Sequence, residues 1–314
     1  QHAAALRIGE EERRKMILFR AASAFPGWNM LKASESSALI ESSAARRLDF
    51  LGGESIGIIG CGHLGRAIAL QLVSGGFPVD RLRVSRGKSD GSLEKILDAG
   101  LGPCLAGNEG ICRECSIIFI CIRPQSLPEL EDLAFPKDAL IVSCLAGVSL
   151  SSIKGLLGVD AVRMMPSGPD SIIEGKGIAA IYPHNQVLSR ILQGLSLRVF
   201  ELSAEEQMHV FTAGICLPAA LLASGEGEGG IERACRSLSR DYPDFPEICS
   251  WARDVLPHFE KEEDKKDYIR KMATSGGITE AIVRSLESGD DLTAALKKGM
   301  DRSREISLFY EYAR

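Results

Sequence analysis

Three glycines at the spacing Gly-x-Gly-x-x-Gly form the first stretch of the chain whose residue types and spacing suit a chemical task. Gly60, Gly62 and Gly65 follow an apolar run at 56–59 and precede a helical pattern that begins at Arg66. In such a setting the first glycine permits a tight turn, the second admits a pyrophosphate close to the backbone, and the third lets helix and strand pack closely. The helix start adds unpaired N–H groups. The pattern predicts a dinucleotide site; the alternative is an ordinary glycine-rich turn.

The residues about 20 positions after the glycines indicate which dinucleotide is bound. A site for NAD carries Asp or Glu at the end of the second strand, where the acid binds the ribose 2′-hydroxyl. This chain has Ser85, Arg86 and Lys88 there, and Asp90 follows only after the expected strand end. Because a guanidinium pairs with a phosphate whereas an acid repels it, the segment favours NADP over NAD. The alternative is an exposed basic turn.

Two further stretches follow later strands of the expected sheet. They are Cys121–Gln125, which reads CIRPQ, and Cys144–Ser149, which reads CLAGVS. In an open parallel sheet the ligand crevice lies beyond the carboxyl ends of the strands. Small residues such as Ala146, and proline, would let the backbone approach a nicotinamide there. Taken singly, each stretch is also compatible with simple loop punctuation.

The whole chain has the composition of a globular protein and excludes several classes of function. Its 314 residues are 45% hydrophobic and 25% charged, which suffices for a sizeable core and two domains. The net charge of −5 gives no basic field for nucleic acid. No apolar run is long enough to suggest a membrane span.

Cysteine usage points to a reduced, cytoplasmic protein. The nine cysteines are an odd number and fall mostly inside expected strands and helices. Cys112 and Cys115 form one C-x-x-C, but no second pair of Cys or His stands at ligand spacing. We therefore expect these thiols to pack in the core, and we expect no metal site.

Three regions follow from the patterning. Residues 1–53 are expected to be a helical extension, with helices over 10–25 and 34–50. Residues 54–202 alternate strand and helix, which predicts an α/β fold with a doubly wound parallel sheet. The expected strands cover 56–59, 81–85, 116–122, 139–144, 161–165 and 177–182. Residues 203–314 are expected to be all-α.

Two features mark this helical region. One is a bend at Pro218 within the helical stretch 204–223. The other is a stripe of small and apolar residues near the C-terminus. It consists of Leu292, Ala295, Leu296, Gly299, Ser303 and Ile306. Such a stripe suits close helix packing or a subunit interface.

The chain resembles the pyrroline-5-carboxylate reductases, which make proline with NADPH. Six pieces match in the family's order over residues 55–307: IGIIGCGHLGRAIA, VSRGKSD, FICIRPQSL, IVSCLAGVSL, VRMMPSGPDSIIEGKGIAAIY, and ATSGGITEAIVRSLESG followed by MDRSREI. The resemblance implies a Rossmann domain followed by a helical domain that forms a homodimer. It also implies an active site between the two domains and hydride transfer to the carbon of a small cyclic imine.

The resemblance also assigns residues to the cofactor. His63 and Leu64 fall on the family's Asn-Met pair within the nucleotide loop, beside the three glycines. Arg123 and Pro124 fall on the first two residues of its Lys-Pro-Gln segment. We expect all four residues to contact NADP.

Further residues are assigned to the substrate. Ser167 follows a Met-Pro pair, and Gly276, Gly277 and Thr279 fall on a Gly-Gly-x-Thr. In the family this Thr hydrogen-bonds the imine nitrogen, which must gain a proton during reduction. The alternative is that Thr279 only caps the next helix, with Glu280 in its first turn.

Departures from the family pattern keep other functions open. Ser167 replaces an Asn, 274–275 reads Thr-Ser instead of Ser-Pro, and 213–220 reads AGICLPAA where a hydroxyl-rich pocket segment is expected. One alternative is a hydroxy-acid or keto-acid dehydrogenase, for which Lys271 or Lys297 would polarise the carbonyl. Another is a catalytically silent protein that binds NADP for regulation.

Overall fold

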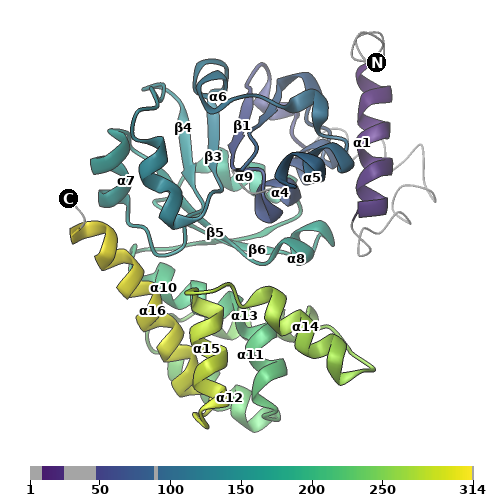
Figure 1. The fold of residues 1–314 in the computed structure, drawn as a ribbon. Coiled ribbons are helices and arrows are strands. Elements are labelled where there is room, and N and C mark those ends of the chain that lie inside the picture. The colour runs from purple at the N-terminus through teal and green to yellow at the C-terminus, as the bar shows by residue number, and fades with distance from the viewer. Residues whose placement is uncertain (1–8, 25–46, 88–90, 313–314) are drawn as a thin grey trace.

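The structure is a computed structural model that describes residues 9–24, 47–87 and 91–312. Within these residues a seven-stranded sheet has the strand order β2-β1-β3-β4-β5-β6-β7 (Figure 1). The strands are β1 Ile56–Ile59, β2 Leu82–Val84, β3 Ile117–Ile120, β4 Leu140–Ser143, β5 Val162–Pro166, β6 Ile178–Tyr182 and β7 Arg198–Glu201.

Strands β1 to β5 run parallel, as expected, but the last two strands do not. β6 pairs antiparallel with β5, and β7 runs parallel to β6. The predicted α/β fold with a doubly wound parallel sheet is confirmed for β1 to β5, but the direction of β6 differs from the prediction, and β7 was not among the expected strands. The link from β5 to β6 contains only the five-residue helix α8, Pro169–Ile173. A parallel crossover usually contains a full helix, which this link lacks.

Helices cover both faces of the sheet, so successive strand residues enter different cores. Ile58 and Phe119 pack in the core that includes α4, whereas Ile59 and Ile120 pack in the core that includes α6 and α7. This burial on both faces explains the almost continuous apolar runs of the strands. The helices of this region are α4 His63–Ser74, α5 Ser92–Asp98, α6 Asn108–Glu114, α7 Leu150–Leu157 and α9 Gln186–Gly194. The short 3-10 turns are η2 Asp49–Leu51, η3 Val79–Arg81, η4 Gly102–Cys104 and η5 Pro124–Leu130.

The region after β7 is entirely helical in the described residues and lies beneath the sheet in Figure 1. A bend of 54° separates α10 from α11 just before Pro218, as the sequence predicts. In the described part of the chain, no single helix is long and apolar enough to cross a membrane. The bent pair of α10 and α11, counted together, has sufficient length and apolar composition. The helices are α10 Gln207–Ile215, α11 Leu217–Ser224, α12 Glu228–Leu238, α13 Phe245–Asp254, α14 Glu262–Met272, α15 Ile278–Glu287 and α16 Leu292–Tyr312.

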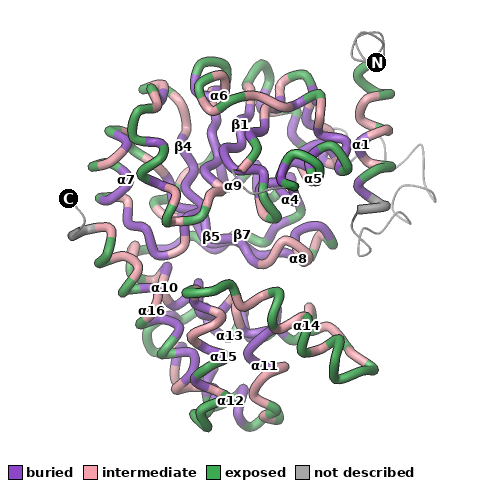
Figure 2. Tube along the Cα trace, viewed as in Figure 1, coloured by how far each residue is buried: buried purple, intermediate pink, exposed green. Residues whose placement is uncertain are grey.

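The stripe of small and apolar residues on α16 packs inside the chain itself (Figure 2). Leu292 and Leu296 have no exposed surface, and Ser303 is 1% exposed. A Cβ on Gly299 would lie 2.6 Å from the side chain of Ile282 on α15, so glycine permits the close approach of the two helices. The stripe is therefore an intramolecular packing surface, and it gives no argument for a subunit interface.

The sheet and the helical region share an apolar boundary. Along β5 and β6, alternate residues point to opposite sides: Met164 and Ile181 enter the core of the sheet. Met165 and Ala180 enter the core of the C-terminal helices. One face of these strands thus serves as the floor on which the helical region packs.

The N-terminal extension contributes one described helix, α1 Glu10–Ala24, in close agreement with the expected helix. It packs against α4, where Arg14 donates hydrogen bonds to the carbonyl oxygens of Val73 and Ser74. The second expected helix, over 34–50, falls almost wholly outside the described residues. The division into 1–53, 54–202 and 203–314 stays a prediction.

Candidate functional site

The glycine loop between β1 and α4 has the geometry that each glycine predicts. Gly60 has φ +91°, and a Cβ there would lie 2.7 Å from Ile122. A Cβ on Gly65 would lie 2.5 Å from the carbonyl oxygen of Gly60, so the helix packs against the turn as closely as glycine allows. Gly62 caps α4 and has open space around its Cα. The loop therefore fits a pyrophosphate lying on the unpaired N–H groups of the first helical turn.

Ser85 braces this loop through its side chain. Its Oγ accepts a hydrogen bond of 3.1 Å from the N–H of Gly60, and its carbonyl oxygen accepts one of 2.8 Å from Cys61. The side chain is buried, so the hydroxyl fixes the loop to the end of β2. Arg86, the next residue, is exposed, and Lys88 lies outside the described residues.

Ser85 and Arg86 also line an open groove of about 480 Å³. Its other walls come from the start of α5 and from the segment that leads into α6, neither of which carries a recognisable motif. They are formed by Leu93, Leu105, Ala106, Gly107 and Asn108. An apolar slot with a guanidinium at its edge suits an adenine ring whose ribose carries a 2′-phosphate. Sequence reasoning missed this wall because only tertiary pairing, such as the bridge between Val84 and Leu105, brings it to the end of β2.

His63 is the first residue of α4 and lies among several charges. Partial burial lowers the pKa of its imidazole, and the positive charges of Arg66, Lys271 and Lys95 lower it further. The carboxylate of Asp170 acts in the opposite direction. The ring is therefore neutral at physiological pH, while the surrounding cations favour an anion at the start of the helix.

The loop after β4 meets the C-terminal helix. Gly147 has φ +76°, and a Cβ there would lie 2.6 Å from Ile306 on α16. Ala146, predicted to contact the cofactor, is half-buried and packs against the core of the helical region. Arg123 and Pro124 begin η5 at the end of neighbouring β3, with Arg123 exposed. The strand ends of the sheet and the helical region therefore face each other here.

The double glycine forms the predicted turn at the start of α15. Gly276 has φ +71°, Gly277 is the N-cap, and Thr279 is the second residue of the helix. The alternative in which Thr279 is the N-cap is therefore wrong. Its Oγ1 instead donates a hydrogen bond of 3.2 Å to Sγ of Cys216, at the bend between α10 and α11. Because sulfur is a weak acceptor, this hydroxyl can be redirected to a better one at small cost.

Cys216 is the partner of Thr279 that sequence reasoning missed. Burial raises the pKa of its thiol to about 11, so the sulfur carries its proton at neutral pH. The thiol also donates to the carbonyl oxygen of Thr212, 3.2 Å away. The sequence did contain a clue to this partner. Cys216 lies in 213–220, the segment that departs from the family pattern, and it is the only residue of that segment whose side chain can donate a hydrogen bond.

Ser167 does not face open space. It is 2% exposed, and its Oγ accepts a hydrogen bond from the N–H of Ile178 and lies 2.8 Å from Oγ of Ser171. The hydroxyl thereby extends the pairing of β5 with β6. Its predicted contact with substrate would require these bonds to be exchanged.

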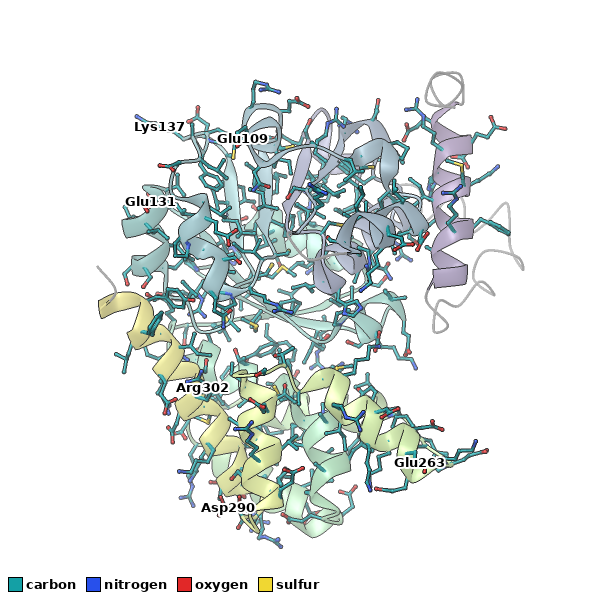
Figure 3. The ribbon with its side chains drawn as sticks, in the orientation of Figure 1. Glu109, Glu131, Lys137, Glu263, Asp290 and Arg302 are labelled. Atoms are coloured by element: carbon teal, nitrogen blue, oxygen red, sulfur yellow. The ribbon has the colours of Figure 1, made fainter. Side chains whose placement is uncertain are left out.

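Gly276 and Gly277 border a second open groove, of about 570 Å³, between α15 and α16. Asp290 and Arg302, labelled in Figure 3, both line it. Arg302 donates a hydrogen bond of 2.9 Å to the carbonyl oxygen of Gly276, and so holds the turn at the start of α15.

Comparison with known proteins shows which proteins the chain is similar to. The family model described as NADP oxidoreductase, coenzyme F420-dependent, matches residues 55–147. The pyrroline-5-carboxylate reductase of Corynebacterium melassecola is 24% identical over 271 residues, covering 80% of this chain and 98% of its own. That of Escherichia coli (strain K12) is 26% identical over 278 residues, covering 81% and 98%. The chain is similar to these pyrroline-5-carboxylate reductases at low identity.

Among solved structures, the Plasmodium falciparum pyrroline carboxylate reductase with NADP bound is 17% identical, with a TM-score of 0.49, and the match covers 81% of this chain and 98% of that one. The resemblance of this chain to the pyrroline-5-carboxylate reductases, first indicated by six short pieces, thus extends over about four-fifths of its length.

The lysines considered for a dehydrogenase and the cysteine pair considered for a metal site lie in other surroundings than the turn at Gly276. Lys271 forms an ion pair of 3.2 Å with Asp170, and Lys297 is exposed on α16. Among the described residues no group of three or more His, Cys, Asp or Glu side chains could hold a metal ion. Cys112 and Cys115 are buried, and burial raises the pKa of each thiol to about 11.

Proposed function

We propose that the protein is an NADPH-dependent reductase that delivers hydride to the carbon of a small cyclic imine, 1-pyrroline-5-carboxylate or a close relative. One observation carries the proposal. The turn at Gly276 and Gly277 opens α15 and presents a hydroxyl, Thr279, together with unpaired helical N–H groups. The neighbouring Ile278 packs in the same core as Ala146 from the loop after β4. This is the side of the sheet where a nicotinamide would lie.

The chain's own residues divide the work. NADPH, when bound, supplies the hydride. The N–H groups at the start of α15 bind a carboxylate of the substrate, because the helix dipole favours negative charge there. The hydroxyl of Thr279 donates to the imine nitrogen, which becomes more basic as the carbon accepts hydride. Arg302 keeps the turn in place through Gly276.

The proposal is tested by NADPH oxidation with 1-pyrroline-5-carboxylate. Thr279→Ala should lower turnover by about 10- to 100-fold, the low end of the range for loss of a positioned proton donor. NADPH affinity, measured by fluorescence, should not change. Thr279→Ser keeps the hydroxyl and should recover most of the activity. If alanine leaves turnover intact, the nitrogen receives its proton from another group and the assignment of Thr279 fails.

A catalytically silent NADP-binding protein is the second candidate. It is favoured by the engagement of the Thr279 hydroxyl with Cys216 and by the burial of Ser167. Tight binding of NADPH without turnover of any cyclic imine or keto acid would establish this function in place of the first.

A further inference from the structure

An ion pair joins the helical region to the nucleotide-binding region beside the glycine loop. Nζ of Lys271, in the last turn of α14, lies 3.2 Å from Oδ2 of Asp170 on α8. The contact continues at the next residue, because Sδ of Met272 lies 3.9 Å from where a Cβ on Gly168 would be. The opposite end of α14 projects into solvent, where Glu263 is labelled in Figure 3.

The helix that carries Asp170 lies along α4, the helix whose start is shaped for a pyrophosphate. Nε2 of Gln71 on α4 donates hydrogen bonds of 2.8 and 2.9 Å to the carbonyl oxygens of Ile172 and Ile173 on α8. At the start of α4, His63 senses both members of the pair: Lys271 lowers the pKa of its ring and Asp170 raises it. The ammonium group therefore lies within electrostatic range of the phosphate-binding turn.

Lys271 can also leave Asp170 for another anion at little cost in stability. The side chain of Lys271 is 53% exposed and that of Asp170 is 41% exposed, and ion pairs so open to water contribute little stability. A lysine carries its charge on a flexible stem and turns readily toward a nearby anion. A pyrophosphate on the first turn of α4 carries more negative charge than one carboxylate.

We propose that Lys271 is a cofactor-binding residue, supplied by the helical region, which leaves Asp170 for the pyrophosphate of the dinucleotide bound at the start of α4. This inference rests on the proposed function only in that the protein binds NADPH.

The inference gives the two members of the pair opposite effects on the cofactor. Lys271→Met removes the cation that neutralises the pyrophosphate, and it should weaken NADPH binding by about 3- to 10-fold, as expected for one exposed charge. Asp170→Asn releases Lys271 and removes a competing negative charge, so it should strengthen binding. A pair that merely tethers two regions would respond equally to the loss of either member.

The test is a fluorescence titration of NADPH with the full-length chain at low and high salt. The matched control is Lys266→Met, which removes an exposed cation from the same helix and should leave the dissociation constant unchanged. Adenosine 2′-monophosphate, which has no pyrophosphate, should bind wild type and Lys271→Met equally in competition. The loss in Lys271→Met should shrink at high salt.

The outcomes distinguish a failure of the role proposed for Lys271 from a failure of the proposed function. Equal affinity of Lys271→Met and wild type for NADPH, or a loss of the same sign in Lys271→Met and Asp170→Asn, overturns the role of Lys271 while the proposed function stands. Failure of wild type to bind NADPH overturns both. Thermal unfolding of each variant shows whether a change in affinity reflects a change in folding.

Discussion

Acidification should destabilise the folded protein through one histidine at the junction of α10 and α16. Nδ1 of His209 lies 2.8 Å from Oγ of Ser303. The pKa of the ring is lowered from 6.5 to about 4, chiefly by burial; the charges of Arg163 and Arg304 act in the same direction, and Glu206 opposes them. The folded state therefore holds a neutral ring. As the pH falls below 6.5 the unfolded chain takes up the proton first, so stability is lost between 6.5 and about 4.

The magnitude follows from the shift. A difference of about 2.5 pKa units, from 6.5 to about 4, corresponds to at most ~3.4 kcal/mol at about 1.36 kcal/mol per unit. Because the ring is only partly buried, water screens the charge, and we expect about 1.5 kcal/mol. His209→Gln keeps a hydrogen-bonding group for Ser303 but does not titrate.

Urea unfolding of both proteins at several pH values isolates this contribution, because other titrating groups cancel in the comparison. Relative to His209→Gln, the wild type should lose about 1.5 kcal/mol of unfolding free energy on going from neutral pH to about pH 4.5. A difference between the two proteins that stays constant over this range would refute the reasoning, as would a wild type that gains stability relative to the variant.

Four further predictions concern the cofactor site, assembly and the C-terminal helix. Gly65→Ala would place a Cβ 2.5 Å from the backbone oxygen of Gly60, so calorimetry should show a lower melting temperature and titration a loss of NADPH binding, whereas Gly53→Ala, with open space around it, should do neither. Arg86→Ala should weaken NADPH by about 10-fold, the low end for a charge-assisted bond because the side chain is exposed, and should leave NADH unchanged; equal losses would reject the 2′-phosphate contact. The homodimer implied by the sequence resemblance stays a prediction, which sedimentation at micromolar concentration would contradict by showing a monomer. Deleting residues 291–314 should cause aggregation, because α16 covers the core of its own chain.

The parts of the fold that local sequence determines were predictable. Gly60 and Gly65 encode the turn between β1 and α4 because a Cβ at either position would clash, whereas Gly62 leaves open space at the start of α4. The turn at Gly276 and the bend before Pro218 were also predictable. Glycine permits backbone angles that other residues avoid, and proline restricts its own backbone angle and cannot donate a backbone hydrogen bond.

The parts that depend on tertiary pairing were not. An apolar run does not reveal the direction of its strand, so the reversal at β6 was missed. Arg198–Glu201 has only two apolar residues between charged ends, and it becomes a strand by pairing with β6. The orientation of a short polar side chain is equally hidden, which is why Ser167 and Thr279 have partners that no motif foretold: Ile178 and Cys216.

The shared face of β5 and β6 has a consequence for how the molecule unfolds. Met165 on β5 and Ala180 on β6 are buried by the C-terminal helices. If those helices separated from the sheet, these apolar side chains of β5 and β6 would be exposed to water. Residues assigned to two regions by sequence pattern therefore form one cooperative unit. Heat or denaturant should disassemble the sheet and the helices in a single transition, and a fragment ending after β7 would be left with an uncovered apolar floor.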